Sequence, residues 1–237
     1  MIKRVFVLLA LSVLVLQFAF SQIKPFRFGL KVAPNVGWIS PDSDGYEKNG
    51  TSAGFSWGFI GDFSITENYF FSSGFNVTYI NGNISQPHTE AIINNGDTTK
   101  YTGTLQRKIK FRYIDLPLTL KMKTNKFDAI QVYGQIGFSV GFNLKAKSDE
   151  TFSYKVGSEY MSTNNTSDIS DEITLVKGSL VLGGGMEYFI DNSTSIVAGI
   201  TYYNGLSNIM KGYNTAYPST KQKTFASYFE LTIGIIF

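Results

Sequence analysis

The sequence predicts an all-β protein, an eight-stranded antiparallel transmembrane up-and-down β-barrel preceded by a cleaved signal peptide. Three observations support this fold class. First, an apolar segment follows two basic residues at the start of the chain. Second, long segments beyond residue 22 alternate between apolar and polar residues. Third, the connections between those segments are alternately short and long along the chain. Together these features are typical of barrels that cross the bacterial outer membrane.

The first residues have the layout of a secretory signal. Lys3 and Arg4 form a basic region, residues 5–20 are almost wholly apolar, and Ala19-Phe20-Ser21 supplies small residues at the two positions that a signal peptidase reads. A retained membrane anchor is the alternative, but the apolar run is shorter than the ~20 residues of a spanning helix. We therefore expect a signal peptide at 1–21 and one outer-membrane barrel domain at 22–237.

Alternation with a period of two is clearest over residues 129–145, where Ile130, Val132 and Ile136 share one face and Gln131 and Gln135 share the other. Strands in soluble proteins usually span only ~5–6 residues, so a strand of this length indicates a tilted membrane strand. Seven other segments follow the same pattern with less purity. The eight predicted strands cover 26–39, 52–65, 69–84, 105–123, 129–145, 173–190, 194–209 and 223–237.

The connections give an independent test of the barrel. Three are short, at 66–68, 124–128 and 191–193, and four are long and polar, at 40–51, 85–104, 148–172 and 210–222. Short turns on the periplasmic side and long loops outside are typical of these barrels. We therefore expect the outer membrane of a Gram-negative bacterium as the location, with both termini in the periplasm and the long loops extracellular.

Two features conflict with uniform strands. Pro34 and Pro117 lie inside predicted strands, where a missing N–H interrupts the ladder, so a bulge or a kink is expected at each. Lys108, Lys110 and Arg112 share the outward register of their strand, which requires that they stand above the lipid or that a bulge resets the phase.

A family resemblance adds to this interpretation. The signal ends in Ala-Phe-Ser-Gln, Phe28-Gly29-Leu30-Lys31 follows in the first strand, Tyr113-Ile114-Asp115-Leu116-Pro117-Leu118 lies in a middle strand, a Gly183-Gly184-Gly185-Met186-Glu187 run comes later, and Phe237 ends the chain. Together these motifs resemble the PorT-like outer-membrane β-barrel family of the Bacteroidota, over essentially the whole chain after the signal.

That resemblance implies insertion by the barrel-assembly machinery, which reads a last strand ending in an aromatic residue. The residues that match this C-terminal assembly signal are Leu231, Ile233, Ile235 and Phe237. The family takes its name from a member with a role in secretion of surface proteins, and most of its members have no assigned activity.

Charged residues of the inward register predict the state of the lumen. Alternation places a cluster of both signs inside the barrel, namely Arg27, Lys31, Asp62, Asp115, Lys121, Glu187 and Glu230. An eight-stranded lumen is only wide enough to be filled by side chains, and buried charges require partners. We expect a plugged, salt-bridged interior with a structural role; the alternative is a wetter lumen with solvated charges.

No constellation of residues points to catalysis, to a cofactor or to a metal site. His88 is the sole histidine and lies in a predicted polar loop, without a recognisable triad motif near Ser85 or Glu90, so we interpret it as a solvated loop residue. The Gly183–Gly185 run lacks the Lys-Ser/Thr of a phosphate loop and is interpreted as close packing or bending of a strand.

Composition narrows the functions further. The chain has no cysteine, which excludes disulfides and a lipid anchor on Cys. Two of its 21 basic residues and none of its 18 acidic residues lie in the signal, which leaves 19 against 18, so no charge argument for nucleic acid survives. We therefore predict a non-enzymatic barrel with a structural or interaction role.

The expected partners are outer-membrane lipid, the barrel-assembly machinery during biogenesis, and other envelope or secretion proteins if the role is accessory to secretion or envelope assembly. Two alternatives stay open. A small solute or ion channel would need a continuous wet lumen, and a lipid-modifying barrel enzyme would have to use His88.

Overall fold

The computed structural model describes residues 26–94 and 97–237, so the predicted signal peptide at 1–21 lies outside the described residues. This part of the chain forms nine β-strands and one short 3-10 helix. They are β1 (Phe26–Pro41), β2 (Glu47–Ser64), β3 (Tyr69–Asn94), β4 (Asp97–Lys123), β5 (Ile130–Val156), β6 (Glu159–Asp168), η1 (Ser170–Glu172), β7 (Val176–Phe189), β8 (Ser195–Gly205) and β9 (Thr224–Ile236). None of the described residues belongs to a helix long and apolar enough to cross a bilayer.

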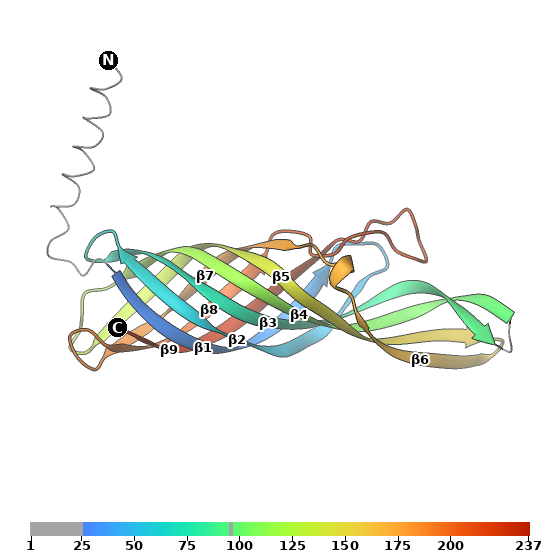
Figure 1. Cartoon of the computed structure of the whole chain (residues 1–237), viewed down its shortest axis with the longest axis horizontal. Coiled ribbons are helices and arrows are strands. Elements are labelled where there is room, and N and C mark those ends of the chain that lie inside the picture. Colours follow the sequence, from blue (N-terminus) through green and yellow to red (C-terminus); the bar gives the residue numbers. More distant parts are fainter. Residues whose placement is uncertain (1–25, 95–96) are drawn as a thin grey trace, which may run out of the picture.

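Eight of the strands close into one antiparallel barrel (Figure 1). Sequential strands pair along the sheet, β1 pairs with β9, and the β4–β5 ladder completes the ring, while β6 pairs only with the outer part of β5. The predicted eight-stranded closed barrel is confirmed. Closure pairs the backbone N–H and C=O groups around the whole ring, which a chain in lipid requires because no water is there to satisfy them.

The two ends of the barrel differ in length. Short turns connect β2 to β3, β4 to β5 and β7 to β8, and the start of β1 and the end of β9 lie at the same end, which we call the turn end (Figure 1). At the opposite end β3, β4, β5 and β6 continue beyond the barrel as a four-stranded arm. We call this the arm end.

The arm corrects the prediction that 85–104 and 148–172 are long loops. β3 continues to Asn94, paired with β4 from Asp97, and β5 continues to Val156, paired with β6. The polar composition of these segments misled the prediction, because a ladder above the lipid needs backbone pairing but no apolar outer face. The predicted strand over 194–209 is also too long, since β8 ends at Gly205.

Side chains alternate between lipid and lumen along each barrel strand. Phe28, Leu30 and Val32 of β1 face outward, whereas Arg27 and Lys31 are buried inside. An aromatic row runs along the turn end from β3 to the end of β9, through Phe71, Phe63, Phe26, Phe28 and Phe237, with neighbouring ring centroids 4.7–6.3 Å apart. Such rows are typical of the membrane interface.

The arm end has an aromatic group of its own on the outer wall. Trp38 of β1, Tyr202 of β8 and Phe229 of β9 pack within 6.1 Å of one another. Trp57, which alternation also suggests for this level, instead faces Val32 and Val77 within the apolar band.

The two prolines interrupt one ladder each without a bulge, contrary to the expectation of a bulge or kink. On either side of Pro34, Val32 faces Ile233 and Asn35 faces Glu230, so equal numbers of residues lie between these pairs on β1 and β9. Pro117 lies in the matching gap between the Ser73–Leu118 and Asn76–Asp115 pairs of β3 and β4. Each proline therefore leaves one local gap in the ladder while the register continues.

A bulge does occur, but in β5. Arg112 faces Lys145 and the next residue, Tyr113, faces Asn143, so Leu144 is the extra residue. The bulge reverses the alternation of β5 above it, while β4 keeps its phase throughout. Lys108, Lys110 and Arg112 therefore point outward, above the apolar outer residues of β4 that begin at Ile114.

Candidate functional site

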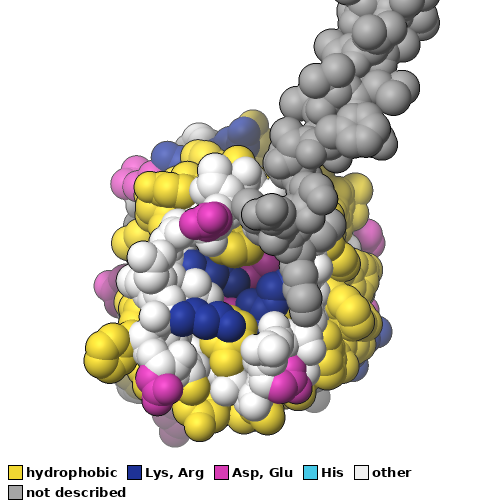
Figure 2. All heavy atoms as spheres, turned by 90° about the vertical axis from the view of Figure 1, so that its left-hand side faces the viewer, with side chains coloured by type: hydrophobic (Ala, Val, Ile, Leu, Met, Phe, Trp, Pro, Cys, Tyr) yellow, Lys and Arg dark blue, Asp and Glu magenta, His cyan; other side chains and the backbone are white. Residues whose placement is uncertain are grey.

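The lumen is filled by a layer of ion pairs toward the turn end. Figure 2 looks into the barrel from that end and shows Lys and Arg side chains gathered with acidic ones in its centre, inside a rim of other side chains. Arg27 donates to Glu187 at 2.7 Å, and Lys123 lies 2.7 Å from the same carboxylate. Lys123 also lies 2.9 Å from Asp62, so it joins two acidic residues.

Asp62 is the second centre of this layer. It accepts from Lys121 at 2.8 Å and from the hydroxyl of Ser72 at 2.6 Å, in addition to Lys123. Arg27 donates further to the hydroxyl of Ser195 at 2.7 Å. Because burying charge costs several kcal/mol per ion unless it is paired and hydrogen-bonded, each ion of this layer depends on its partners.

Two further pairs lie deeper in the lumen. Lys31 donates to Glu230, and Lys177 lies 2.8 Å from Asp115, with all four side chains buried. The Lys177 ammonium also lies 4.8 Å from the centre of the Tyr113 ring, a distance at which a cation and an aromatic face attract each other.

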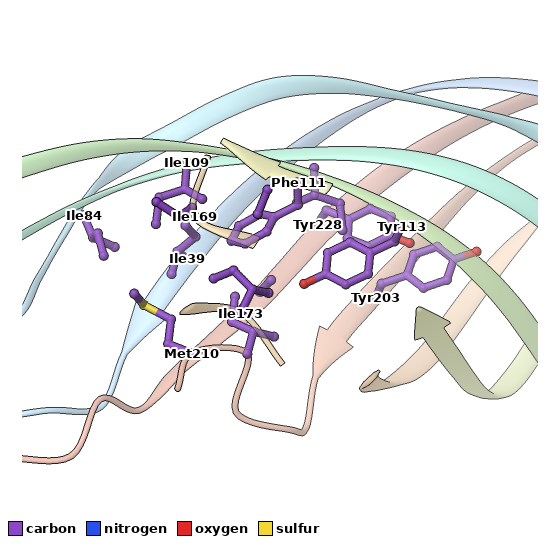
Figure 3. Close-up of a cluster of buried hydrophobic side chains, with 14 of the residues drawn as sticks. Ile39, Ile84, Ile109, Phe111, Tyr113, Ile169, Ile173, Tyr203, Met210 and Tyr228 are labelled. Carbon is purple, nitrogen blue, oxygen red and sulfur yellow. The ribbon is translucent and has the colours of Figure 1, made fainter. Parts of the chain in front are cut away.

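Beyond these pairs an apolar plug fills the arm end of the lumen (Figure 3). It is made of strand residues and of segments that fold back into the mouth. The strands contribute Ile39, Ile80, Ile109, Phe111 and Tyr228 among others. The folded-back segments contribute Ile169 and Ile173 on either side of η1, and Ile209 and Met210 from the β8–β9 connection.

The plug and the ion pairs leave little space between them. A cavity of about 40 Å3 lies beside Lys31, Asn76, Tyr133 and Thr201, enough for about one water molecule. The plug residues Ile39, Ile80 and Ile109 have no solvent-exposed surface. Among the described residues, the lumen between the ion pairs and the plug is therefore closely packed.

The ring of Tyr133 lies against one glycine of the β7 run, Gly185, and against Gly199 of β8. Gly185 faces Gly199 across the β7–β8 ladder, and the Tyr133 hydroxyl lies against both. A Cβ at Gly199 would lie 2.3 Å from that hydroxyl oxygen, and one at Gly185 would lie 2.7 Å from it. Gly185 and Gly199 therefore make room for the ring of Tyr133, so at Gly185 the run is closely packed.

The arm has a small core of its own. Leu105, Phe152 and Tyr154 are buried on one face of the arm sheet, with Ile92 and Tyr101 packed against them. A hollow of about 460 Å3 runs over Leu105 and Phe152, between the end of β3 and residues 163–165 of β6. On the outside, Tyr160 and Met161 of β6 are exposed.

Arg107 joins the arm to the plug. Its guanidinium lies 2.7 Å from Glu150 of β5 and 2.9 Å from Glu172 of η1. These two carboxylates, led by Glu172, outweigh the burial of the group and hold the pKa of Arg107 above its ordinary value. The positions of η1 and of the folded-back segment are therefore coupled to the arm.

His88 is half-buried in β3, which corrects its interpretation as a solvated loop residue. Its ring packs edge-on against Phe152 at 5.3 Å, and Nδ1 lies 2.7 Å from the Thr215 hydroxyl of the β8–β9 connection. Burial lowers the pKa of His88 from its ordinary value. Ser85 and Glu90, its neighbours in sequence, make no hydrogen bond to the ring.

A family model described as the outer membrane protein beta-barrel domain matches residues 18–211. The chain belongs to this family. Its location is accordingly the outer membrane of Gram-negative bacteria.

Three solved structures are similar to this chain at low sequence identity. The barrel is similar to neisserial surface protein A (14% identity, TM-score 0.41, covering 90% of this chain and 96% of that one) and to OprG from Pseudomonas aeruginosa (11%, 0.45, 90% and 95%). It is also similar to the attachment invasion locus protein Ail of Yersinia pestis (15%, 0.38, 90% and 99%). No curated protein matches the sequence significantly.

All seven sequence-predicted lumen charges of this outer-membrane barrel lie inside it, each in an ion pair. Lys123 and Lys177 complete the pairing but are absent from the prediction. Both have the inward parity of their strands, so the alternation itself carries the signal that could have identified them.

The predicted assembly residues Leu231, Ile233, Ile235 and Phe237 share the outward face of the last strand segment. They therefore face lipid rather than the lumen, on the strand that closes the ring against β1.

Proposed function

We propose that this protein is a non-enzymatic outer-membrane barrel whose role is structural or interactive. In this proposal the barrel holds the arm outside the cell, with the termini and the short turns in the periplasm. A role accessory to protein secretion or envelope assembly is the more specific version. The Tyr113–Leu118 motif further supports a PorT-like member of the family, in a bacterium of the Bacteroidota.

One observation carries the proposal: the interior is filled, whereas the arm projects from the barrel. Ion pairs and the apolar plug occupy the lumen from one end to the other, so the barrel offers no wet path for a solute. The arm extends a four-stranded sheet beyond the lipid band, with Tyr160, Met161 and Ile93 exposed on it. Exposed apolar and aromatic side chains on a projecting element are typical of contact surfaces.

The lumen charges serve, in this proposal, to fix the barrel rather than to act on a substrate. Each of the seven predicted residues forms an ion pair with a residue of opposite sign. Two of these partners, Lys123 and Lys177, are lysines outside the predicted set. During biogenesis, Leu231, Ile233, Ile235 and Phe237 would present the last strand to the barrel-assembly machinery.

Orientation is tested by adding protease to intact cells. Cleavage within 153–163 of the arm, with the turns at 66–68 and 191–193 protected until the membrane is broken, supports the proposal. The reverse pattern contradicts it.

The interaction role is tested with a photo-crosslinking residue placed at Tyr160 on the arm. The matched control carries it at Tyr217, an exposed tyrosine of the β8–β9 connection. We expect one defined envelope protein to be cross-linked from position 160, and the product to disappear when residues 89–102 are replaced by a short turn. No product from either position, or equal products from both, would count against the arm as the contact surface.

The channel alternative is separated by reconstitution in a planar bilayer. A plugged lumen predicts no steady conductance from the folded protein, whereas steady single-channel steps would overturn the proposal.

A further inference from the structure

Five basic side chains form a patch on the outer wall of the barrel, just beyond the apolar band. This cationic patch consists of Lys108, Lys110 and Arg112 on β4 with Lys145 and Lys147 on β5. All five point away from the lumen. On β4 the first outward apolar residue below the patch is Ile114, which faces Phe142 of β5. The patch therefore lies at the level where hydrocarbon gives way to lipid head groups.

The pairing of the two strands sets like charges directly opposite each other. Lys110 faces Lys147, and Arg112 faces Lys145. Like charges in opposed positions destabilise a sheet, so this arrangement is unfavourable unless an anion lies between them. The bulge at Leu144 creates it, because it turns Lys145 and Lys147 to the same face as Lys110 and Arg112.

Acidic side chains neutralise only part of the patch. Lys110 contacts Asp149, and Lys145 lies 3.5 Å from Asp168. Within the described residues, Lys108, Arg112 and Lys147 make no ion pair with a carboxylate. The patch therefore keeps an excess of positive charge beside the membrane.

The surface between these side chains is hollowed. A hollow of about 350 Å3 is lined by Tyr79, Asn81, Lys110, Arg112, Lys145 and Lys147. Arg112 lies over the ring of Tyr79 at 5.1 Å, which holds the guanidinium close to the wall while its edges stay available as donors. Guanidinium and ammonium groups that surround a hollow suit a phosphate, to which they donate charge-assisted hydrogen bonds.

We propose that the cationic patch binds the phosphate groups of a glycolipid in the surrounding outer leaflet. The position at the head-group level favours a lipid over a soluble phosphate, because the acyl chains would lie against Ile114 and Phe142 below. The inference rests on the proposed orientation, with the arm outside. Protease access to the arm tests that orientation separately, so the two failures are distinguishable.

The test uses the full chain in phosphatidylcholine nanodiscs containing lipid A, either with its phosphates or after phosphatase treatment. Native mass spectrometry measures the lipid A that stays bound. The patch variant is K110Q/R112Q/K147Q, and the matched control, K155Q/K211Q/K221Q, removes three exposed positive charges elsewhere on the arm and loops. Heat-dependent gel mobility selects the folded fraction of each.

We expect the patch variant to retain about tenfold less phosphorylated lipid A than the unaltered protein, and the control to stay within about twofold, since each basic side chain at an anionic membrane surface contributes severalfold to binding. Dephosphorylated lipid A should bind all three proteins equally weakly. In pure phosphatidylcholine the patch variant should be at least as resistant to denaturant as the unaltered protein, because the opposed like charges are gone.

Other outcomes overturn the inference. An equal loss in both variants would indicate a general effect of net charge, and unchanged retention in the patch variant would remove the site. Equal binding of dephosphorylated lipid A would exclude phosphate recognition. Displacement of the lipid by inorganic phosphate at equal concentration would show a soluble-anion site instead.

Discussion

Lys123 Nζ lies 2.7 Å from a carboxylate oxygen of Glu187, and neither side chain has any surface exposed to solvent. The same ammonium lies 2.9 Å from Asp62. Lys123 therefore joins the Arg27–Glu187 pair to the Lys121–Asp62 pair, and connects β4 through the lumen to β2 and to β7. Contacts across the lumen of this kind fix the shape of the ring in addition to the ladders around it.

Removal of this link should destabilise the barrel. Lys123→Met keeps the length of the side chain but leaves Asp62 and Glu187 with one cation fewer, and we expect the free energy of unfolding to fall by about 3 kcal/mol or more, as for other broken buried pairs. Urea unfolding in lipid vesicles measures it. Lys100→Met, at an exposed position of the arm, is the control and should change little. A Lys123→Met barrel as stable as the control would show that the network is not a connected unit.

The pattern of alternation predicts the ring and most of the charged side chains of the lumen because the parity of β1 and β4 is unbroken. Parity alone places the side chains of Arg27 and Lys31 on β1, and of Asp115 and Lys121 on β4, in the lumen. Lys123 has the same parity, but at the end of a strand a lysine is equally expected to reach the water. Its position is decided by Asp62 and Glu187, which are distant in sequence.

The apolar plug could not be predicted from the same rule. Ile39, Ile80 and Ile109 are inward residues of barrel strands, where alternation leads one to expect polar side chains. They are buried because Ile173 and Met210 fold into the mouth from two separate connections, and a contact of this kind leaves no periodic pattern in the sequence. The bulge at Leu144 likewise has no local glycine or proline to mark it.

The contact between Tyr133 and the two facing glycines gives a second prediction. Gly199→Ala places a Cβ against the Tyr133 hydroxyl, and we expect a loss of about 1–3 kcal/mol of unfolding free energy, as for other overpacked cores. Tyr133→Phe should restore a large part of it in the double variant, because the oxygen is the nearest atom. Gly134→Ala, with open space around the new carbon, is the control. A double variant no better than Gly199→Ala would place the strain elsewhere.

The plug predicts protection of its residues from water, and the absence of cysteine from the chain makes this simple to measure. Ile173→Cys should react with a soluble maleimide roughly a hundredfold more slowly than Ile93→Cys, since Ile173 is 1% exposed and Ile93 is 71% exposed. Denaturant should make the two rates equal. Rapid labelling at 173 in the folded barrel would mean that the mouth is open and would favour the channel alternative.

The sole histidine reports on the contact between the arm and the β8–β9 connection. Burial beside Phe152 lowers the pKa of His88, so NMR titration of its ring should give a midpoint below the ordinary 6.5. Phe152→Ala, which exposes the ring, should return the midpoint toward 6.5. A midpoint at or above 6.5 in the unaltered protein would contradict the burial.

The direction of this shift also fixes how acid affects the contact. The folded protein binds a proton at His88 less readily than the unfolded chain does. The contribution of His88 to the free energy of unfolding therefore falls as the pH drops below 6.5, and it levels off below the midpoint of the folded state. In the tautomer whose Nδ1 accepts from the Thr215 hydroxyl, protonation removes this hydrogen bond, because both ring nitrogens of the cation are donors. Exchange slows intrinsically as the pH falls, so the rates are first corrected for this effect. After that correction, we expect the backbone amides of 213–217 to be less protected from hydrogen exchange at pH 5 than at pH 7. His88→Gln should abolish that pH dependence, while an unchanged dependence would assign it to another group.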